Sequence, residues 1–199
     1  MKLKGGIKMR LFHATTIGGL DILRANSCDR DGNPVLYLTD NIPYSLFYIR
    51  DREIDFVTCG VREGGIVHYD EKFPNQLETL YRGLSGWIYE VDTEAVRTKI
   101  NGIYVVHNDV VVLNKMYIPD VLKAIWDETE KDKVHILPYA DLSAEQKRIN
   151  QDGMIQWFLS DQNMNPKKKE LLRKHFPEAW EEARRILDKS SHRCYDIQK

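Results

Sequence analysis

Residues 9–15, MRLFHAT, form the first apolar segment of the chain and contain a histidine. A short apolar run ends at His13 and is followed by polar residues, which predicts a strand that stops at a turn. The next residues, TIGGLDILRAN (16–26), have the apolar spacing of a short helix, with Thr15 or Thr16 as its N-cap. A histidine in this place is either a satisfied part of the fold or half of a binding site.

A second stretch, PVLYLTDNIPYSLFYI (34–49), repeats this order of elements. Its first half predicts a strand, in which Tyr37 faces opposite to the leucines beside it. Its second half predicts a helix capped by Asp40 or Asn41, because Pro43 suits the first turn. The question about His13 therefore becomes whether Tyr37 completes the same site.

The remaining sequence predicts an α+β protein with a helical C-terminal third. Residues 1–140 contain about six short strand patterns and form the expected core. Residues 141–199 form the expected helical extension, packed on that core. Within it, the run 165–191 predicts a helix that Asn165 caps.

Composition excludes several classes of function. A net charge of −1 and a pI near 6.6 argue against nucleic-acid binding, which needs a surplus of basic residues. We expect no membrane span or signal peptide, because no long apolar run occurs, and we expect a cytoplasmic protein with free thiols. The six histidines never fall at i, i+4 and no CxxC pair exists, so no metal site is predicted.

The order of a strand with a histidine, a helix, a loop, a strand with a tyrosine and another helix resembles an ADP-ribosyltransferase-like domain of the poly(ADP-ribose) polymerase and diphtheria-toxin type. LFHAT (11–15) is similar to the family's first motif and PVLYLTDNIPYSLFYI to its second. The resemblance implies a core of short mixed and antiparallel strands. It also implies NAD as the substrate, an unknown acceptor, and no metal.

The same resemblance implies roles for six residues. His13 would bind the ribose of NAD with Thr15 beside it, and Tyr37 would lie under the nicotinamide, with both side chains facing one cleft. Ser45 and Tyr48 would follow on the helix. Asp109, directly before VVVL, matches the family's late carboxylate, which is usually Glu. Breaking the nicotinamide–ribose bond develops positive charge on the sugar, which a carboxylate stabilises.

Other interpretations stay open at this point. The scaffold could be a catalytically inactive module that binds a ligand or partner, a possibility favoured by the Asp in place of Glu. An unrelated α+β protein could carry short His and Tyr motifs by chance. A separate candidate site pairs Cys59 with His68 across a predicted hairpin, where an imidazole could activate the thiol.

Overall fold

The computed structural model describes residues 10–29, 31–54, 56, 58–92, 98–100, 102–161 and 163–196. These residues divide into two compact units, which are described separately. The first contains the described residues of 1–50, 57–70 and 77–136, and the second those of 51–56, 71–76 and 137–199.

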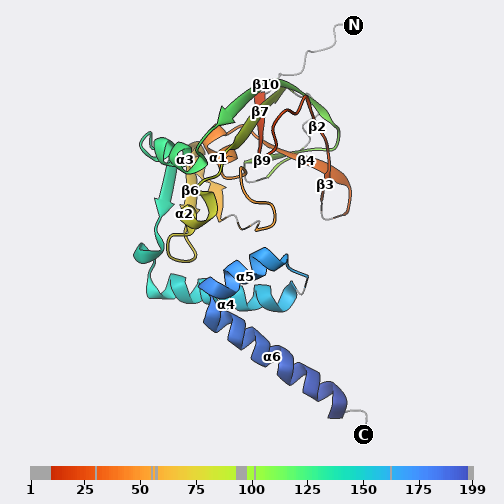
Figure 1. Ribbon diagram of the computed structural model, residues 1–199, viewed down its shortest axis with the longest axis vertical. Coiled ribbons are helices and arrows are strands. Elements are labelled where there is room, and N and C mark those ends of the chain that lie inside the picture. Colours follow the sequence, from red (N-terminus) through yellow and green to blue (C-terminus); the bar gives the residue numbers. More distant parts are fainter. Residues whose placement is uncertain are drawn as a thin grey trace. The chain divides into compact units, whose positions relative to one another are not determined.

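The first unit is built on a mainly antiparallel sheet (Figure 1). Its strands follow the order β2-β10-β7-β1-β4-β9-β8, and β3 pairs with β4. Their bounds are β1 Arg10–Thr15, β2 Ile22–Leu23, β3 Ser27–Cys28, β4 Pro34–Thr39, β7 Gly86–Asp92, β8 Thr98–Ile100, β9 Ile103–Val106 and β10 Val110–Ile118. The α+β class and the short antiparallel strands predicted from the sequence are confirmed.

A second, three-stranded sheet and three helices complete this unit. The sheet has the order β11-β6-β5, and α1 contacts α3 (Figure 1). The bounds are α1 Ile42–Leu46, β5 Cys59–Val61, β6 Val67–Asp70, α2 Gln76–Tyr81, α3 Val121–Thr129 and β11 Val134–Leu137. Asn41 caps α1 by accepting a hydrogen bond from the Tyr44 amide, as expected for one of the two predicted caps.

The short connection between β9 and β10 forces the large sheet to curl. Only four residue steps separate Val106 at the end of β9 from Val110 at the start of β10, a reach of about 14 Å at most. In a flat sheet these strands would lie four spacings apart, about 19 Å. The sheet therefore bends until β9 and β10 approach each other, and the connection 107–109 crosses its open end.

The curl divides the buried residues of the sheet between two faces. We call the closed side the inner face; its core cluster comprises Leu11, Leu23, Leu36, Leu38, Tyr89, Val91, Tyr104, Val106 and Val110. On the outer face, Ala14 and Ile88 pack in a cluster with the residues of α1, α2 and α3. The alternation of side chains along each strand therefore decides to which of the two faces a motif residue points.

Two helix predictions need correction. Residues 16–26 form a turn and the short strand β2 instead of a helix, since Gly19 adopts a φ of 75° and β2 pairs with β10. A side chain at Gly18 would also collide with Trp87. The run from Asn165 forms two helices because Pro177 cannot continue the hydrogen bonding of the first.

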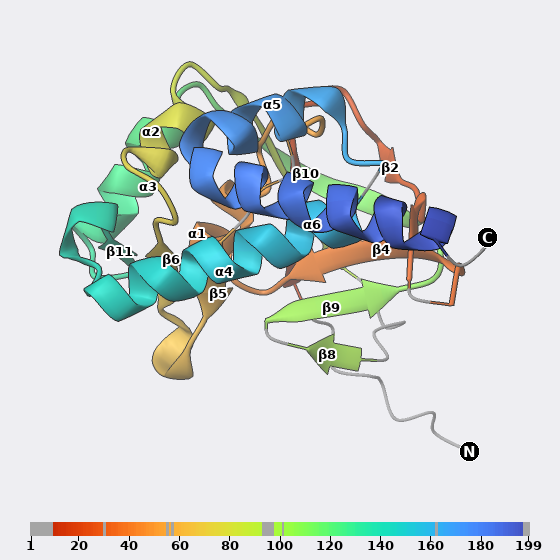
Figure 2. The same ribbon diagram turned by 90° about the horizontal axis from the view of Figure 1, so that it is seen from below.

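The second unit is mostly helical. Its helices are α4 Ala144–Ser160, α5 Pro166–His175 and α6 Pro177–Asp196, and α6 contacts both of the others (Figure 2). Ser143 and Gln146 form a reciprocal capping box at the start of α4, a motif that satisfies two backbone amides that the helix leaves without partners.

Candidate functional site

The two strands that carry the motifs, β1 with His13 and β4 with Tyr37, are neighbours in the sheet. β1 pairs with β7 along its whole length, from Arg10 to Thr15, whereas β1 and β4 are joined in register at the single pair Phe12–Thr39. Beyond that pair, Nδ1 of the His13 ring lies 3.1 Å from the carbonyl oxygen of Tyr37. The imidazole thus takes a position that a continued ladder would give to the backbone of β1.

This contact identifies Nδ1 as a ring nitrogen that carries a hydrogen. A carbonyl oxygen only accepts hydrogen bonds, so Nδ1 of His13 donates and carries the hydrogen. In the neutral imidazole, Nε2 then keeps its lone pair and accepts. Such a ring suits a sugar hydroxyl, which can donate to it.

The rings of His13 and Tyr37 leave the sheet on different faces. His13 lies opposite Tyr89, whose side chain belongs to the inner core. Tyr37 alternates with Leu36 and Leu38 of the same core, so its ring points to the outer face, where it is 38% exposed. The expectation that both side chains line one face of a cleft is therefore not met. The fold brings together the ring of His13 and the backbone of Tyr37.

Thr15 is the last residue of β1 and contacts the turn that follows. Its side chain is buried, and its Oγ1 accepts a hydrogen bond of 3.3 Å from the Ile17 amide. The Tyr89 hydroxyl fixes the same turn, donating to the Ile17 carbonyl at 2.8 Å and accepting from the Leu20 amide at 3.3 Å. The segment after the first motif is held against the inner core by these contacts.

Ser45 and Tyr48 lie on α1 and just after it. The Ser45 hydroxyl is buried and donates to the Ile42 carbonyl at 2.7 Å. The half-buried Tyr48 donates to the Tyr44 hydroxyl at 2.9 Å, and the Arg50 guanidinium lies 4.9 Å from its ring centre. Burial raises the pKa of Tyr48, so its hydroxyl stays neutral. Both side chains therefore have structural partners.

Asp109 lies in the connection that crosses the open end of the curled sheet. It is exposed, and its Oδ1 accepts a hydrogen bond of 2.9 Å from the Ala25 amide. Ala25 packs against the inner core. This contact ties the crossing to the segment between the two motif strands. It also gives Asp109 a structural reason to be an acidic residue.

A hollow of 440 Å³ lies beside the start of α1 and was not expected from the sequence. The Asp40 carboxylate in its wall accepts from the Tyr104 hydroxyl at 2.7 Å, and the Asn41 amide donates to the Gly65 carbonyl at 2.7 Å. Its lining residues are Asp40, Asn41, Val61, Arg62, Gly65 and Gly102. The glycine pair Gly64–Gly65 is apparent in the sequence, but no local sequence pattern indicates that Arg62 and Asp40 line the same hollow.

The pairing of Cys59 with His68 does not form. Cys59 lies opposite Tyr69 and His68 opposite Gly60, so the two side chains leave the hairpin on different faces. Burial raises the pKa of the Cys59 thiol to about 12, which keeps it protonated. A neutral buried thiol is a poor nucleophile.

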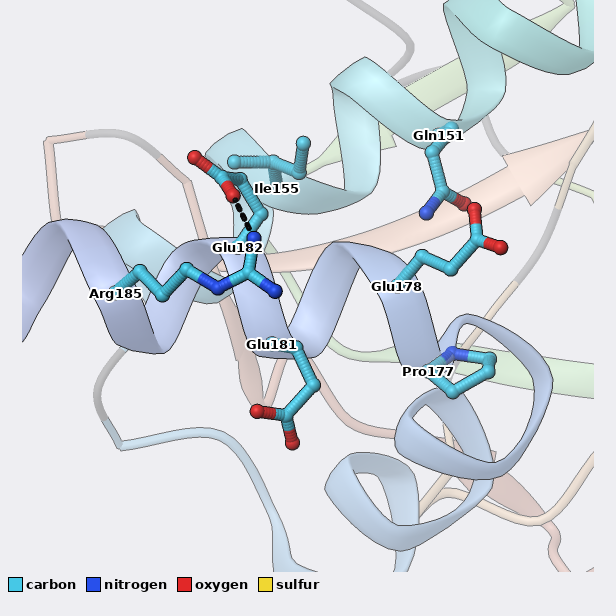
Figure 3. Close-up of a pocket in the computed structure, with 7 residues that line it drawn as sticks. All are labelled: Gln151, Ile155, Pro177, Glu178, Glu181, Glu182 and Arg185. Atoms are coloured by element: carbon cyan, nitrogen blue, oxygen red, sulfur yellow. Dashed lines mark hydrogen bonds and ion pairs between the residues drawn. The ribbon is translucent and has the colours of Figure 1, made fainter.

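The second unit has a hollow of its own, of 490 Å³, between α4 and α6 (Figure 3). Ile155 and Pro177 supply its apolar surface, and Arg185 pairs with Glu182 at 2.9 Å across one wall. Gln151, Glu178 and Glu181 complete the lining. None of the residues implied by the resemblance belongs to this unit.

Comparisons with known proteins add no identification: no protein-family model, curated protein or solved structure matches the chain. Within the described residues, no group of three or more His, Cys, Asp or Glu side chains could hold a metal ion. The same residues include no helix with the length and apolar character needed to cross a membrane.

Proposed function

We propose that the first unit binds NAD where the ladder between β1 and β4 ends and breaks its nicotinamide–ribose bond, either by transferring ADP-ribose to an acceptor or by hydrolysis. The observation that supports this most is the hydrogen bond from the His13 ring to the Tyr37 carbonyl. It links the two motifs at the place where the ladder between their strands ends.

The division of the two rings between faces suggests how an extended dinucleotide would lie. His13 would meet a ribose hydroxyl from the inner face through Nε2. The exposed Tyr37 ring would offer the nicotinamide a stacking surface on the outer face, with a cation–π contribution of about 0.5–2 kcal/mol from the charged ring. NAD would then contact both faces of the sheet beyond the Phe12–Thr39 pair.

Asp109 would supply the negative charge for the reaction. Nicotinamide leaves with the electron pair of the glycosidic bond, and the anomeric carbon becomes oxocarbenium-like. One carboxylate oxygen of Asp109 holds the Ala25 amide, and the group as a whole would stabilise the cation or orient the attacking hydroxyl or water. The proton of that nucleophile would pass to the carboxylate or to solvent.

The hydrogen bond between Asp109 and Ala25 favours a second candidate, a module that binds NAD without turning it over. A carboxylate engaged by a backbone amide already has a role in the fold. The two candidates predict the same binding and differ only in product.

The test is the release of nicotinamide, followed by chromatography during incubation of the protein with NAD. Turnover that disappears in Asp109→Ala, with NAD affinity retained, supports the reaction. Glu90→Ala is the matched control, because this carboxylate lies on β7 of the same unit and bonds Arg10. Binding without release of nicotinamide supports the second candidate. Absence of both binding and release contradicts the proposal.

A further inference from the structure

His68 and His135 form a side-by-side pair that lies outside the residues discussed for NAD. The amide of Val67 bonds the carbonyl of Lys133 at 2.9 Å, which aligns β6 with β11. Val67 and Val134, one residue before each histidine, are both buried. The two imidazoles therefore share the opposite face of this small sheet, where His135 is exposed and His68 half-buried.

The separation of the rings matches that of two imidazoles bound to one metal ion. Their centroids lie 5.0 Å apart, with an angle of 77° between the ring planes. A metal–nitrogen bond of about 2.0–2.1 Å places each centroid roughly 3.2 Å from the ion. Ligand angles between about 90° and 109° then give centroid separations of about 4.5–5.2 Å.

The surroundings leave space for an ion. The neighbour of His68 on its other side is Gly60. Apart from the chain neighbours of Gly60, no described residue has a heavy atom within 4 Å of where a Cβ would be at this position. Two charged groups act on His68, the Asp70 carboxylate and the Arg62 guanidinium. The Arg62 guanidinium has the larger effect of the two, so the Asp70 carboxylate offsets its repulsion of a cation only in part.

We propose that His68 and His135 form a two-histidine site for a divalent transition-metal ion of the class that prefers imidazole, such as Zn²⁺, Ni²⁺ or Cu²⁺, with water as the other ligands. The site is independent of NAD binding. Sequence spacing could not reveal it, because its two ligands come from strands far apart in the chain.

The experiment is calorimetric titration of ZnCl₂ into the chain without an affinity tag. The wild type should bind one ion per chain, and His68→Ala and His135→Ala should each weaken binding more than about tenfold, because each leaves a single ligand. His107→Ala, which removes an exposed histidine elsewhere in the first unit, is the matched control and should bind like the wild type.

Two results would overturn the proposal. One is the absence of saturable Zn²⁺ binding by the wild type. The other is binding that both variants retain, which would place the ion elsewhere. His68→Gln and His135→Gln provide a second pair of variants, and circular dichroism confirms that each is folded. MgCl₂, an ion that prefers oxygen ligands, should produce no heat of binding at this site.

Discussion

Replacing Tyr89 with Phe removes one hydroxyl from the inner core and tests how the turn after β1 is held. The Tyr89 side chain is completely buried, with 0% of its surface exposed. Its hydroxyl donates to the Ile17 carbonyl at 2.8 Å and accepts from the Leu20 amide at 3.3 Å. The substitution keeps the ring and therefore isolates these two hydrogen bonds.

The expected cost follows from what replaces the hydroxyl. A buried polar group that loses its partner costs about 1–3 kcal/mol. Ile17 is 46% exposed, so water can reach its carbonyl and reduce the penalty. The bond from Leu20 is long and contributes less. We expect the free energy of unfolding of the first unit to fall by about 1–2 kcal/mol.

Urea unfolding measures this change, and hydrogen exchange locates it. Protection of the Leu20 amide should fall roughly tenfold, since 1.4 kcal/mol corresponds to a factor of ten. Tyr117→Phe is the control, because this tyrosine is 51% exposed on the same sheet and its loss should change neither quantity. Equal protection of Leu20 in wild type and Tyr89→Phe would refute the reasoning.

Three further changes have defined outcomes. Gly86→Ala should destabilise the sheet by about 1–3 kcal/mol in urea unfolding, because the new Cβ would lie 2.7 Å from the Thr15 carbonyl oxygen; Gly60→Ala, with open space, should not. Ser143→Ala removes the cap of α4 and should cost about 1 kcal/mol, measured as a lower urea midpoint. Burial lowers the pKa of His175, so as the pH falls the unfolded chain takes up this proton before the folded chain does. The contribution of the neutral ring to the free energy of unfolding is therefore complete above pH about 6.5 and is lost below it. Unfolding from pH 8 to 5 should therefore show a weaker pH dependence in His175→Gln.

The sequence predicted those elements whose local pattern agrees with their tertiary contacts. Asn41 caps α1, as one of the two predicted cap residues. The segment 16–26 was mispredicted because its apolar spacing fits a helix, whereas pairing of β2 with β10 decides its conformation. Propensity is a weak prior where a distant strand supplies the hydrogen bonds.

The candidate site was predictable only in part. Local motifs identified His13 and Tyr37, and the fold places their strands side by side. The face to which each ring points depends on register between strands, which no short motif encodes. The same limit applies to His68 and His135, whose approach results from the pairing of β6 with β11.

The central claim is that NAD binds where the His13 ring meets the Tyr37 carbonyl. Calorimetric titration of NAD into the wild type, His13→Ala and Tyr37→Ala tests it most directly. Tyr117→Ala and His135→Ala are the matched controls, because both side chains are exposed elsewhere in the first unit. We predict saturable binding that both motif variants lose and both controls keep. No binding by the folded wild type at millimolar NAD, or binding that His13→Ala and Tyr37→Ala retain, would contradict the account.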